Sequence, residues 1–236
     1  MPSLAPRNDL AQLRAEFQRH RRVLVPKLLA EPLLSNLRAR LLSWRQWALV
    51  TRLAGEHRTF DSLAMGQLDG RTHANFMAQV QAEAQQGFQY LFERYALIDR
   101  GDAGQLDDAV LTQTYDLLRS KSLLELVREI SGMPGIERVD GQLTRYRSGH
   151  FLNEHDDAAP TRRIAYSLNM SADWPPELGG QLQFLGNDGE VQSSWPPQFN
   201  ALSLFAVPQM HRVQAVSADT DRCRFAITGW FHSPSA

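Results

Sequence analysis

The first part of the chain, up to about residue 135, carries apolar residues at the spacing of amphipathic helices. Many of them recur three or four positions apart, which is the period of a helix with one buried face. The runs are Leu10, Leu13 and Phe17; Leu28, Leu33, Leu37 and Leu41; Phe76, Val80, Phe88 and Leu91; Leu117, Leu118, Leu123, Leu124 and Val127. Asp9 stands where it would cap the first helix, and Ser122 begins a Ser-Leu-Leu-Glu capping box for the last. This part is predicted to be mainly helical, with a loop over residues 53–72.

After residue 135 the pattern changes to short strands separated by turns. Gly132 and Pro134 end the helical part, and pairs such as Gly179-Gly180 separate later apolar runs. Strands are predicted over residues 142–147, 151–155, 163–170, 180–184, 201–207, 211–216 and 224–231. Such strands are typical of a sandwich or a jelly-roll barrel. We expect an α+β fold of one domain, residues 1–236, in which helical support (1–135) packs outside a β core (136–236) that holds the active site.

Composition and charge describe an ordinary globular protein. The 236 residues are 43% hydrophobic and 22% charged, which is enough to form a substantial core. A net charge of −1 does not suggest nucleic acid or an anionic membrane as a partner. The one cysteine, Cys223, excludes an internal disulfide framework and a cysteine-rich zinc site. No run approaches the roughly 18–20 apolar residues of a membrane span, and no signal-peptide core is visible, so a cytoplasmic protein is expected.

His155-Asp156-Asp157 and the distant His211 give the strongest chemical signal. Alternate side chains of an extended chain share a face, so His155 and Asp157 are predicted to converge while Asp156 faces away. His211 follows the apolar strand at 201–207, from which a sheet can return it to the same place. Two imidazoles and one carboxylate are the ligands of a facial-triad Fe(II) site, which leaves positions open for a co-substrate and O2. A lone histidine is more often structural, so the prediction depends on the combination.

Arg224 begins an apolar C-terminal strand and is predicted to face inward. A buried guanidinium needs an anion, and its planar fork suits a carboxylate held by two hydrogen bonds. A salt bridge to a protein carboxylate is the alternative. Tyr146 could donate a phenolic hydrogen bond into the same pocket, or be only a half-buried strand aromatic. Asn169 is polar where a buried apolar residue would be expected, and Thr228 shares the inward parity of Arg224, so both are further candidates to line the pocket.

The other histidines have no partners at ligand spacing. His150 has the opposite strand parity to His155, and a turn separates the two, so it is predicted to lie at the surface or the pocket rim. No role is predicted for His20, His57, His73 and His232. A zinc hydrolase is disfavoured because the metalloprotease spacing H-E-x-x-H is missing from the sequence.

Residues 140–232 resemble the 2-oxoglutarate/Fe(II)-dependent oxygenases. The matching positions are Tyr146, the His155-Asp156-Asp157 run, residues 162–166, Trp174, residues 179–182, residues 198–200, His211 and residues 224–232. Among these, the runs H-D-D, R-R-I-A, G-G and R-x-x-I-x-G-W-F-H are similar to the branch of prolyl hydroxylases that acts on a small-subunit ribosomal protein. One departure is Asn169, which stands where that branch usually carries a second tyrosine for the co-substrate.

The resemblance implies a double-stranded β-helix with Fe(II) on His155, Asp157 and His211. It also implies that Arg224 binds the distal carboxylate of 2-oxoglutarate and that Tyr146 contacts this co-substrate. O2 would be the oxidant, with ascorbate a candidate stimulant. The expected reaction is hydroxylation of a proline in a protein or peptide, for which a ribosomal protein is a candidate. A free amino acid or other small molecule is the alternative substrate, and a barrel that binds a metal or ligand without oxidative chemistry is the alternative function.

Overall fold

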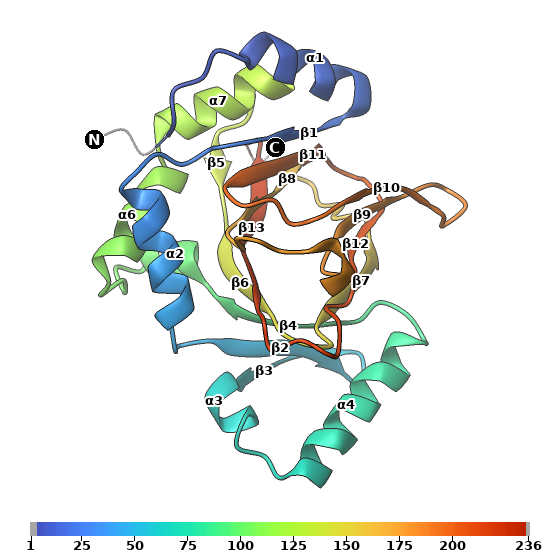
Figure 1. The fold of residues 1–236 in the computed structure, drawn as a ribbon. Helices are drawn as coiled ribbons and strands as arrows, with labels where there is room; N and C mark the ends of the chain where they lie inside the picture. Colours follow the sequence, from blue (N-terminus) through green and yellow to red (C-terminus); the bar gives the residue numbers. More distant parts are fainter. Residues whose placement is uncertain (1–3, 235–236) are drawn as a thin grey trace.

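The computed structural model describes residues 4–234, and its strands form one long sheet that curls into a barrel (Figure 1). The strands are β1 Arg22–Val25, β2 Ala48–Leu53, β3 Glu56–Asp61, β4 Tyr90–Tyr95, β5 Arg138–Val139, β6 Gln142–Tyr146, β7 Phe151–His155, β8 Arg162–Asn169, β9 Leu182–Leu185, β10 Val191–Trp195, β11 Ala201–Ala206, β12 His211–Val213 and β13 Arg224–His232. Their order is β1-β11-β8-β13-β6-β4-β7-β12-β9-β10, and β2 pairs with β4 and β3. Strand β4 lies across the gap between β6 and β7 and joins the two walls of the barrel (Figure 1).

The helices lie outside this barrel (Figure 1). They are α1 Leu10–His20, α2 Leu33–Ser43, α3 Ser62–Met65, α4 Gly70–Ala84, α5 Leu97–Asp102, α6 Ala109–Leu118 and α7 Lys121–Ser131, with a 3-10 turn at Pro176–Leu178. Buried leucines and valines of α1, α2, α6 and α7 share the main hydrophobic core with the outer faces of β8, β11 and β13. This arrangement confirms the predicted α+β fold, a jelly-roll core with helices packed on its outside.

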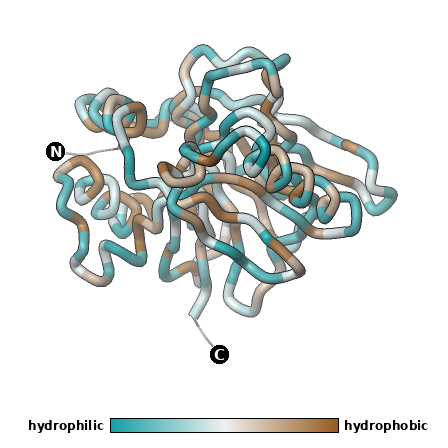
Figure 2. Tube along the Cα trace, turned by 90° about the horizontal axis from the view of Figure 1, so that it is seen from below, coloured by the Kyte–Doolittle hydropathy of each residue, from teal (hydrophilic) through white to brown (hydrophobic). Residues whose placement is uncertain are grey.

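Strand β13 shows how the alternation of side chains separates core from cavity. Phe225, Ile227 and Phe231 point outward into the core that the helices cover. Arg224 and Thr228, on the opposite face of the strand, line the interior of the barrel. One short segment therefore supplies both packing and chemistry, because successive strand residues face opposite sides. Over residues 4–234, hydrophobic positions are frequent on the inner segments and hydrophilic ones on the outer loops (Figure 2).

Side chains cap the helices, but not always the predicted ones. Helix α7 begins after Ser120, whose hydroxyl accepts the Leu123 N–H at 3.2 Å, so the capping box predicted at Ser122 is wrong by two positions. Asp9 precedes α1 as predicted, yet it makes no side-chain cap. Its carboxylate instead pairs with Arg7, with Nη2 to Oδ2 at 2.7 Å. The ion pair with Arg7 therefore replaces the predicted cap at the N-terminus of α1.

Four strands in the N-terminal half differ from the helical prediction. The hairpin of β2 and β3 and the short helix α3 occupy most of the stretch predicted as a loop at 53–72. Phe88 and Leu91 were assigned to a helix, but α4 ends at Ala84 and Leu91 belongs to β4. Strand β4 is only 6 residues long, too short for its period of two to outweigh the helical spacing beside it.

The C-terminal strands match the prediction more closely. All seven predicted strands occur with ends displaced by a few residues, whereas β5 and β10 were not predicted. Strand β10 has exposed and half-exposed residues throughout and so lacks an apolar pattern. None of the helices within residues 4–234 has the length and apolar character that crossing a membrane requires.

Candidate metal and anion site

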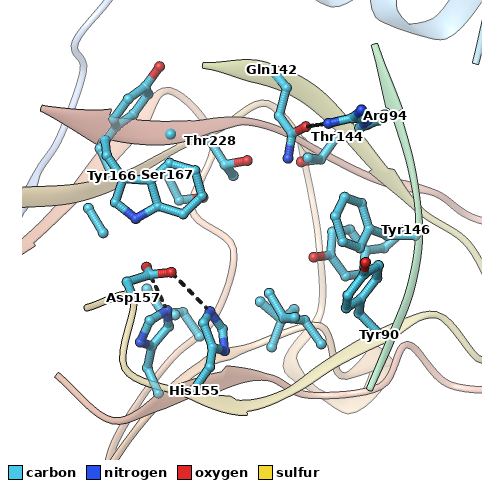
Figure 3. Close-up of a pocket in the computed structure, with 18 of the residues that line it drawn as sticks. Tyr90, Arg94, Gln142, Thr144, Tyr146, His155, Asp157, Tyr166, Ser167 and Thr228 are labelled. Atoms are coloured by element: carbon cyan, nitrogen blue, oxygen red, sulfur yellow. Dashed lines mark hydrogen bonds and ion pairs between the residues drawn. The ribbon is translucent and has the colours of Figure 1, made fainter. Parts of the chain in front are cut away.

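The inside of the barrel contains a cavity of about 330 Å³ (Figure 3). Its walls come from β4, β6, β8 and β13 on one side and from β7, β9 and β12 on the other. Both groups of candidate residues reach this one space. Arg224 and Tyr146 line it from the first wall, and His155 and His211 line it from the second.

The predicted metal ligands lie together. Strands β7 and β12 pair so that His155, the last residue of β7, stands directly opposite His211, the first of β12. The Nε2 atoms of His155 and His211 are each 3.4 Å from a different oxygen of Asp157. One ligand atom from each of the three residues lies within 4.8 Å of the others, which is close enough for a shared cation.

Asp157 reaches the site by a route that the sequence argument did not predict. The predicted convergence needs an extended chain from His155 to Asp157, but β7 ends at His155 and Asp157 has a φ of 61°. This left-handed conformation is uncommon for a residue other than glycine and is tolerated best by Asp and Asn. A tight turn, not strand alternation, therefore brings the carboxylate back toward the imidazoles.

The backbone fixes the direction of both imidazoles. Nδ1 of His155 donates to the carbonyl oxygen of Asn153 at 2.8 Å, and Nδ1 of His211 donates to that of Gln209 at 2.7 Å. A carbonyl can only accept, so each Nδ1 carries the proton and each Nε2 presents a lone pair toward Asp157. Second hydrogen bonds of this kind orient the histidine ligands of metal sites.

The electrostatics of the site also suit a cation. Burial, reinforced by the neighbouring His211, lowers the pKa of His155 to about 4, so the ring is neutral at pH 7. Burial alone would raise the pKa of Asp157, but its contacts with His211 and His155 hold it below its ordinary value. Two neutral nitrogen donors and one carboxylate fit a facial Fe(II) site.

Arg224 is a buried cation whose guanidinium is only partly satisfied. Its side chain is 2% exposed, and Nη2 donates to Oδ1 of Asn169 at 3.2 Å. Nε and Nη1 are also buried and have no hydrogen-bond partner in the described residues. Burial lowers the pKa of Arg224, and the structure pairs it with no carboxylate within residues 4–234. The protein salt bridge considered as the alternative is thus not found there, and an external anion fits the orphaned N–H groups.

Of the other three predicted pocket residues, Tyr146 and Thr228 line the cavity and Asn169 does not. Tyr146 lies in the cavity wall with its ring centroid 5.3 Å from the Arg224 guanidinium carbon, and Thr228 lines the same cavity. Asn169 is buried beside Arg224 but does not line the cavity. Its amide oxygen accepts from Arg224, so it orients this guanidinium. A direct contact with the co-substrate remains a prediction for all three.

Several cavity residues were not predicted from the sequence. The cavity is also lined by Tyr90 and Arg94 of β4, Gln142 and Thr144 of β6, and His57 of β3. Nδ1 of His57, for which no role was predicted, is 2.5 Å from the Tyr90 hydroxyl. The available signal was the alternation of β4, whose odd-numbered residues are buried while the even-numbered ones face the cavity.

The prediction for His150 is wrong, because the residue is buried with 7% of its surface exposed. The chain turns tightly here, with the His150 N–H bonded to the Arg147 carbonyl, and the ring is carried into the protein instead of toward solvent. Burial lowers the pKa of His150 to about 4. His232 is also buried, but it pairs with Asp140 at 2.9 Å and does not line the cavity.

The C-terminal region is similar to known proteins. Residues 141–232 match the family model described as the 2OG-Fe(II) oxygenase superfamily. The curated protein Prolyl 3-hydroxylase OGFOD1 of Xenopus laevis is 34% identical over 104 residues, which cover 41% of this chain and 20% of the relative. Prolyl 3,4-dihydroxylase OGFOD1 of Ostreococcus tauri is 36% identical over 107 residues, which cover 40% and 21%. The chain thus spans about a fifth of the length of the curated relatives it matches.

Solved structures share the fold at low sequence identity. A Pseudomonas putida prolyl-4-hydroxylase is 19% identical with a TM-score of 0.59, covering 96% of this chain and 100% of that one. An oxidoreductase of the 2OG-Fe(II) oxygenase family from Burkholderia pseudomallei is 13% identical with a TM-score of 0.61, covering 99% and 96%. The epimerase SnoN from nogalamycin biosynthesis is 14% identical with a TM-score of 0.57, covering 95% and 83%. These likenesses establish the fold, and residues 141–232 match the model of the 2OG-Fe(II) oxygenase superfamily.

Proposed function

We propose that the protein is an Fe(II)- and 2-oxoglutarate-dependent hydroxylase that acts on a proline of a protein or peptide. The observation that carries the proposal is the pairing of two sites in one cavity. A cation site of His155, Asp157 and His211 faces the same space as Arg224, a buried guanidinium with two unpartnered N–H groups. A dicarboxylate that chelates the metal at one end and meets Arg224 at the other would satisfy both.

Each residue has a distinct part in this scheme. His155, Asp157 and His211 would hold the metal through one face and leave the remaining positions open. Arg224 would bind the distal carboxylate, and Asn169 engages Nη2 and leaves Nε and Nη1 without a partner in the described residues. Fe(II) with 2-oxoglutarate and O2 supplies the chemistry that hydroxylates an unactivated C–H bond, with succinate and CO2 as by-products. The apolar and aromatic wall limits water near the reacting carbon.

The substrate class is proposed from the relatives, several of which carry the name of prolyl hydroxylases. A small-subunit ribosomal protein is the first candidate, because the sequence resembles the branch that acts on one. SnoN carries the same fold and is named as an epimerase of nogalamycin biosynthesis, so the fold alone does not select a polypeptide. A free amino acid or another small molecule is therefore the second candidate.

The experiment is a turnover assay with purified protein, Fe(II), 2-oxoglutarate and O2, with and without ascorbate. Succinate is measured, and ribosomal proteins and proline peptides are searched by mass spectrometry for a gain of one oxygen on proline. Asp157→Asn should abolish both signals. Asp156→Asn is the matched control, because Asp156 is exposed and its Oδ1 accepts only the Ala158 N–H at 2.9 Å.

The outcomes separate the alternatives. Oxygen gain on a proline residue supports the proposal, whereas oxygen gain on free amino acids alone supports the small-molecule alternative. A wild-type protein that binds neither metal nor 2-oxoglutarate would leave a barrel without oxidative chemistry and would end the proposal.

A further inference from the structure

We propose that Arg94 is a second anion site in the cavity, which binds a carboxylate of the substrate and makes the enzyme selective for acidic substrates. The inference rests on the proposed function and extends it to the chemistry of the substrate. The carboxylate has two possible sources: an Asp or Glu side chain near the hydroxylated residue of a peptide, or the α-carboxylate of a free amino acid. The experiment below distinguishes them.

Arg94 stands apart from the guanidinium assigned to 2-oxoglutarate. In the sheet Arg94 is opposite Thr144, which is opposite Ala226, whereas Arg224 lies two residues before Ala226 on β13. The strand spacing and the rise per residue separate the two backbone positions by roughly 10 Å across the sheet and roughly 7 Å along it. Figure 3 shows Arg94 beside Gln142 and Thr144, across the cavity from Asp157.

Arg94 also lies nearer to solvent. Arg224 and Tyr146 are buried, with 2% and 3% of their surfaces exposed. Gln142, Thr228 and Arg94 are half-buried. Arg94 is therefore more exposed than Arg224, so a substrate entering the cavity would meet Arg94 while the co-substrate occupies the deeper end.

The guanidinium of Arg94 is not neutralised by the protein. Its one side-chain hydrogen bond donates to Oε1 of Gln142 at a long 3.4 Å, and no carboxylate within residues 4–234 lies within 4.0 Å of it. The charge of Arg94 affects the titration of its neighbour His57. Burial is the main cause of the lowered pKa of His57, and the charges of Arg94 and then Arg52 lower it further.

Counting the charges in the cavity leads to the same conclusion. Among the described lining residues there are three guanidinium groups, Arg94, Arg162 and Arg224, and one carboxylate, Asp157. A divalent metal and dianionic 2-oxoglutarate cancel each other, so the loaded cavity keeps an excess of positive charge. Arg162 is partly engaged, since it stacks on Trp230 with its guanidinium carbon 3.5 Å from the ring centroid and lies 3.9 Å from Asp157 Oδ1. Arg94 has no such partner and is the cation left for the substrate.

The experiment measures binding, so it does not require turnover. The protein is loaded with Mn(II), which replaces Fe(II) without supporting oxidation, and with 2-oxoglutarate. N-acetylated, C-terminally amidated heptapeptides with a central proline carry Glu, Gln or Lys at one flanking position at a time, and L-proline is compared with L-prolinamide. Affinities are measured by calorimetry for the wild type, Arg94→Gln and Arg94→Glu. Arg58→Gln is the control, because this arginine of β3 does not line the cavity and pairs only with exposed Glu56.

We expect at least one acidic probe to bind roughly tenfold more tightly than its amide counterpart. Arg94→Gln should remove this difference, Arg94→Glu should favour the Lys peptide, and the control should retain the wild-type preference. A preference confined to L-proline over L-prolinamide would identify the α-carboxylate as the source. The inference is overturned if no acidic probe is preferred, or if Arg94→Gln keeps the preference.

The 2-oxoglutarate titration distinguishes this failure from failure of the proposed function. If every variant binds 2-oxoglutarate normally but none discriminates charge, only the role of Arg94 is wrong. If the wild type does not bind 2-oxoglutarate at all, the proposed function is wrong and the inference falls with it.

Discussion

Replacing Arg224 by Met tests the proposed co-substrate site most directly. Met keeps much of the length and apolar volume of the side chain and removes the guanidinium. Arg224 is buried and has two unpartnered donors, Nε and Nη1. A hydrogen bond to a charged group contributes about 1.5–3 kcal/mol, so two of them contribute about 3–6 kcal/mol to binding. We therefore expect 2-oxoglutarate to bind roughly 10²- to 10⁴-fold more weakly to the variant.

Measuring a second ligand on both proteins gives a thermodynamic cycle, in which one change is made in the protein and the other in the ligand. 2-Oxopentanoate has a methyl group in place of the distal carboxylate of 2-oxoglutarate but keeps the 2-oxo acid that chelates the metal. Calorimetry on Mn(II)-loaded protein gives both affinities for both proteins. The wild type should prefer 2-oxoglutarate by the full factor, and Arg224→Met should show little preference, because the two changes remove the same interaction.

Two outcomes of this cycle would refute a contact between Arg224 and the distal carboxylate. Equal losses for both ligands would mean that Arg224 supports the shape of the cavity and does not contact the distal carboxylate. Unchanged affinity for 2-oxoglutarate would place the carboxylate elsewhere. Circular dichroism and thermal unfolding of the variant serve as controls for a folding defect.

Three further predictions concern stability, each measured by urea unfolding of the metal-free protein. Gly229→Ala should lower the free energy of unfolding by about 1–3 kcal/mol, because an added Cβ would overlap the backbone of Asp140 and Gly141. Gly135→Ala is the control, since the space around Gly135 is open and its stability should change little. Equal effects of the two substitutions would contradict the steric explanation. Glu93→Gln should lower the free energy of unfolding by about 3–5 kcal/mol, because it leaves Arg145 buried without its charged partner. The control Glu56→Gln breaks only an exposed pair and should cost less than about 1 kcal/mol. A similarly small loss for Glu93→Gln would show that Arg145 does not need this carboxylate for stability. The pKa of His150 is about 4 in the folded protein, below its value of 6.5 in the unfolded chain, so stability falls as the pH drops from about 6.5 toward 4. Relative to His150→Asn, the wild type should lose about 2 kcal/mol between pH 7 and pH 5, and parallel pH profiles would show that His150 is not the cause.

The clustering of the site could be predicted from the sequence because its chemistry is unusual. His155, Asp157 and His211 are residue types that proteins seldom combine without a ligand, and a buried arginine such as Arg224 demands an anion. The route that brings them together was less visible. The left-handed turn at Asp157 leaves no mark in the sequence beyond the tolerance of Asp for that conformation.

The N-terminal strands could not be predicted because local pattern and tertiary pairing conflict there. Strand β4 is stabilised by pairing with β2, β6 and β7, which are partners distant in sequence, while its neighbour α4 imposes a helical spacing on the same window. The burial of His150 depends likewise on a turn geometry and on packing that one residue type does not encode. Long-range contacts decided these elements, and propensity did not.

Strand β4 bridges the two walls of the barrel, and this position has an evolutionary consequence. The side chains proposed to hold iron and 2-oxoglutarate all lie within the stretch shared with the family, residues 141–232. The facing panel of Tyr90, Phe92 and Arg94 comes from outside that stretch. Substitutions in this strand can therefore alter the proposed substrate contacts while the proposed iron and 2-oxoglutarate sites stay intact, so target choice and catalysis can diverge separately.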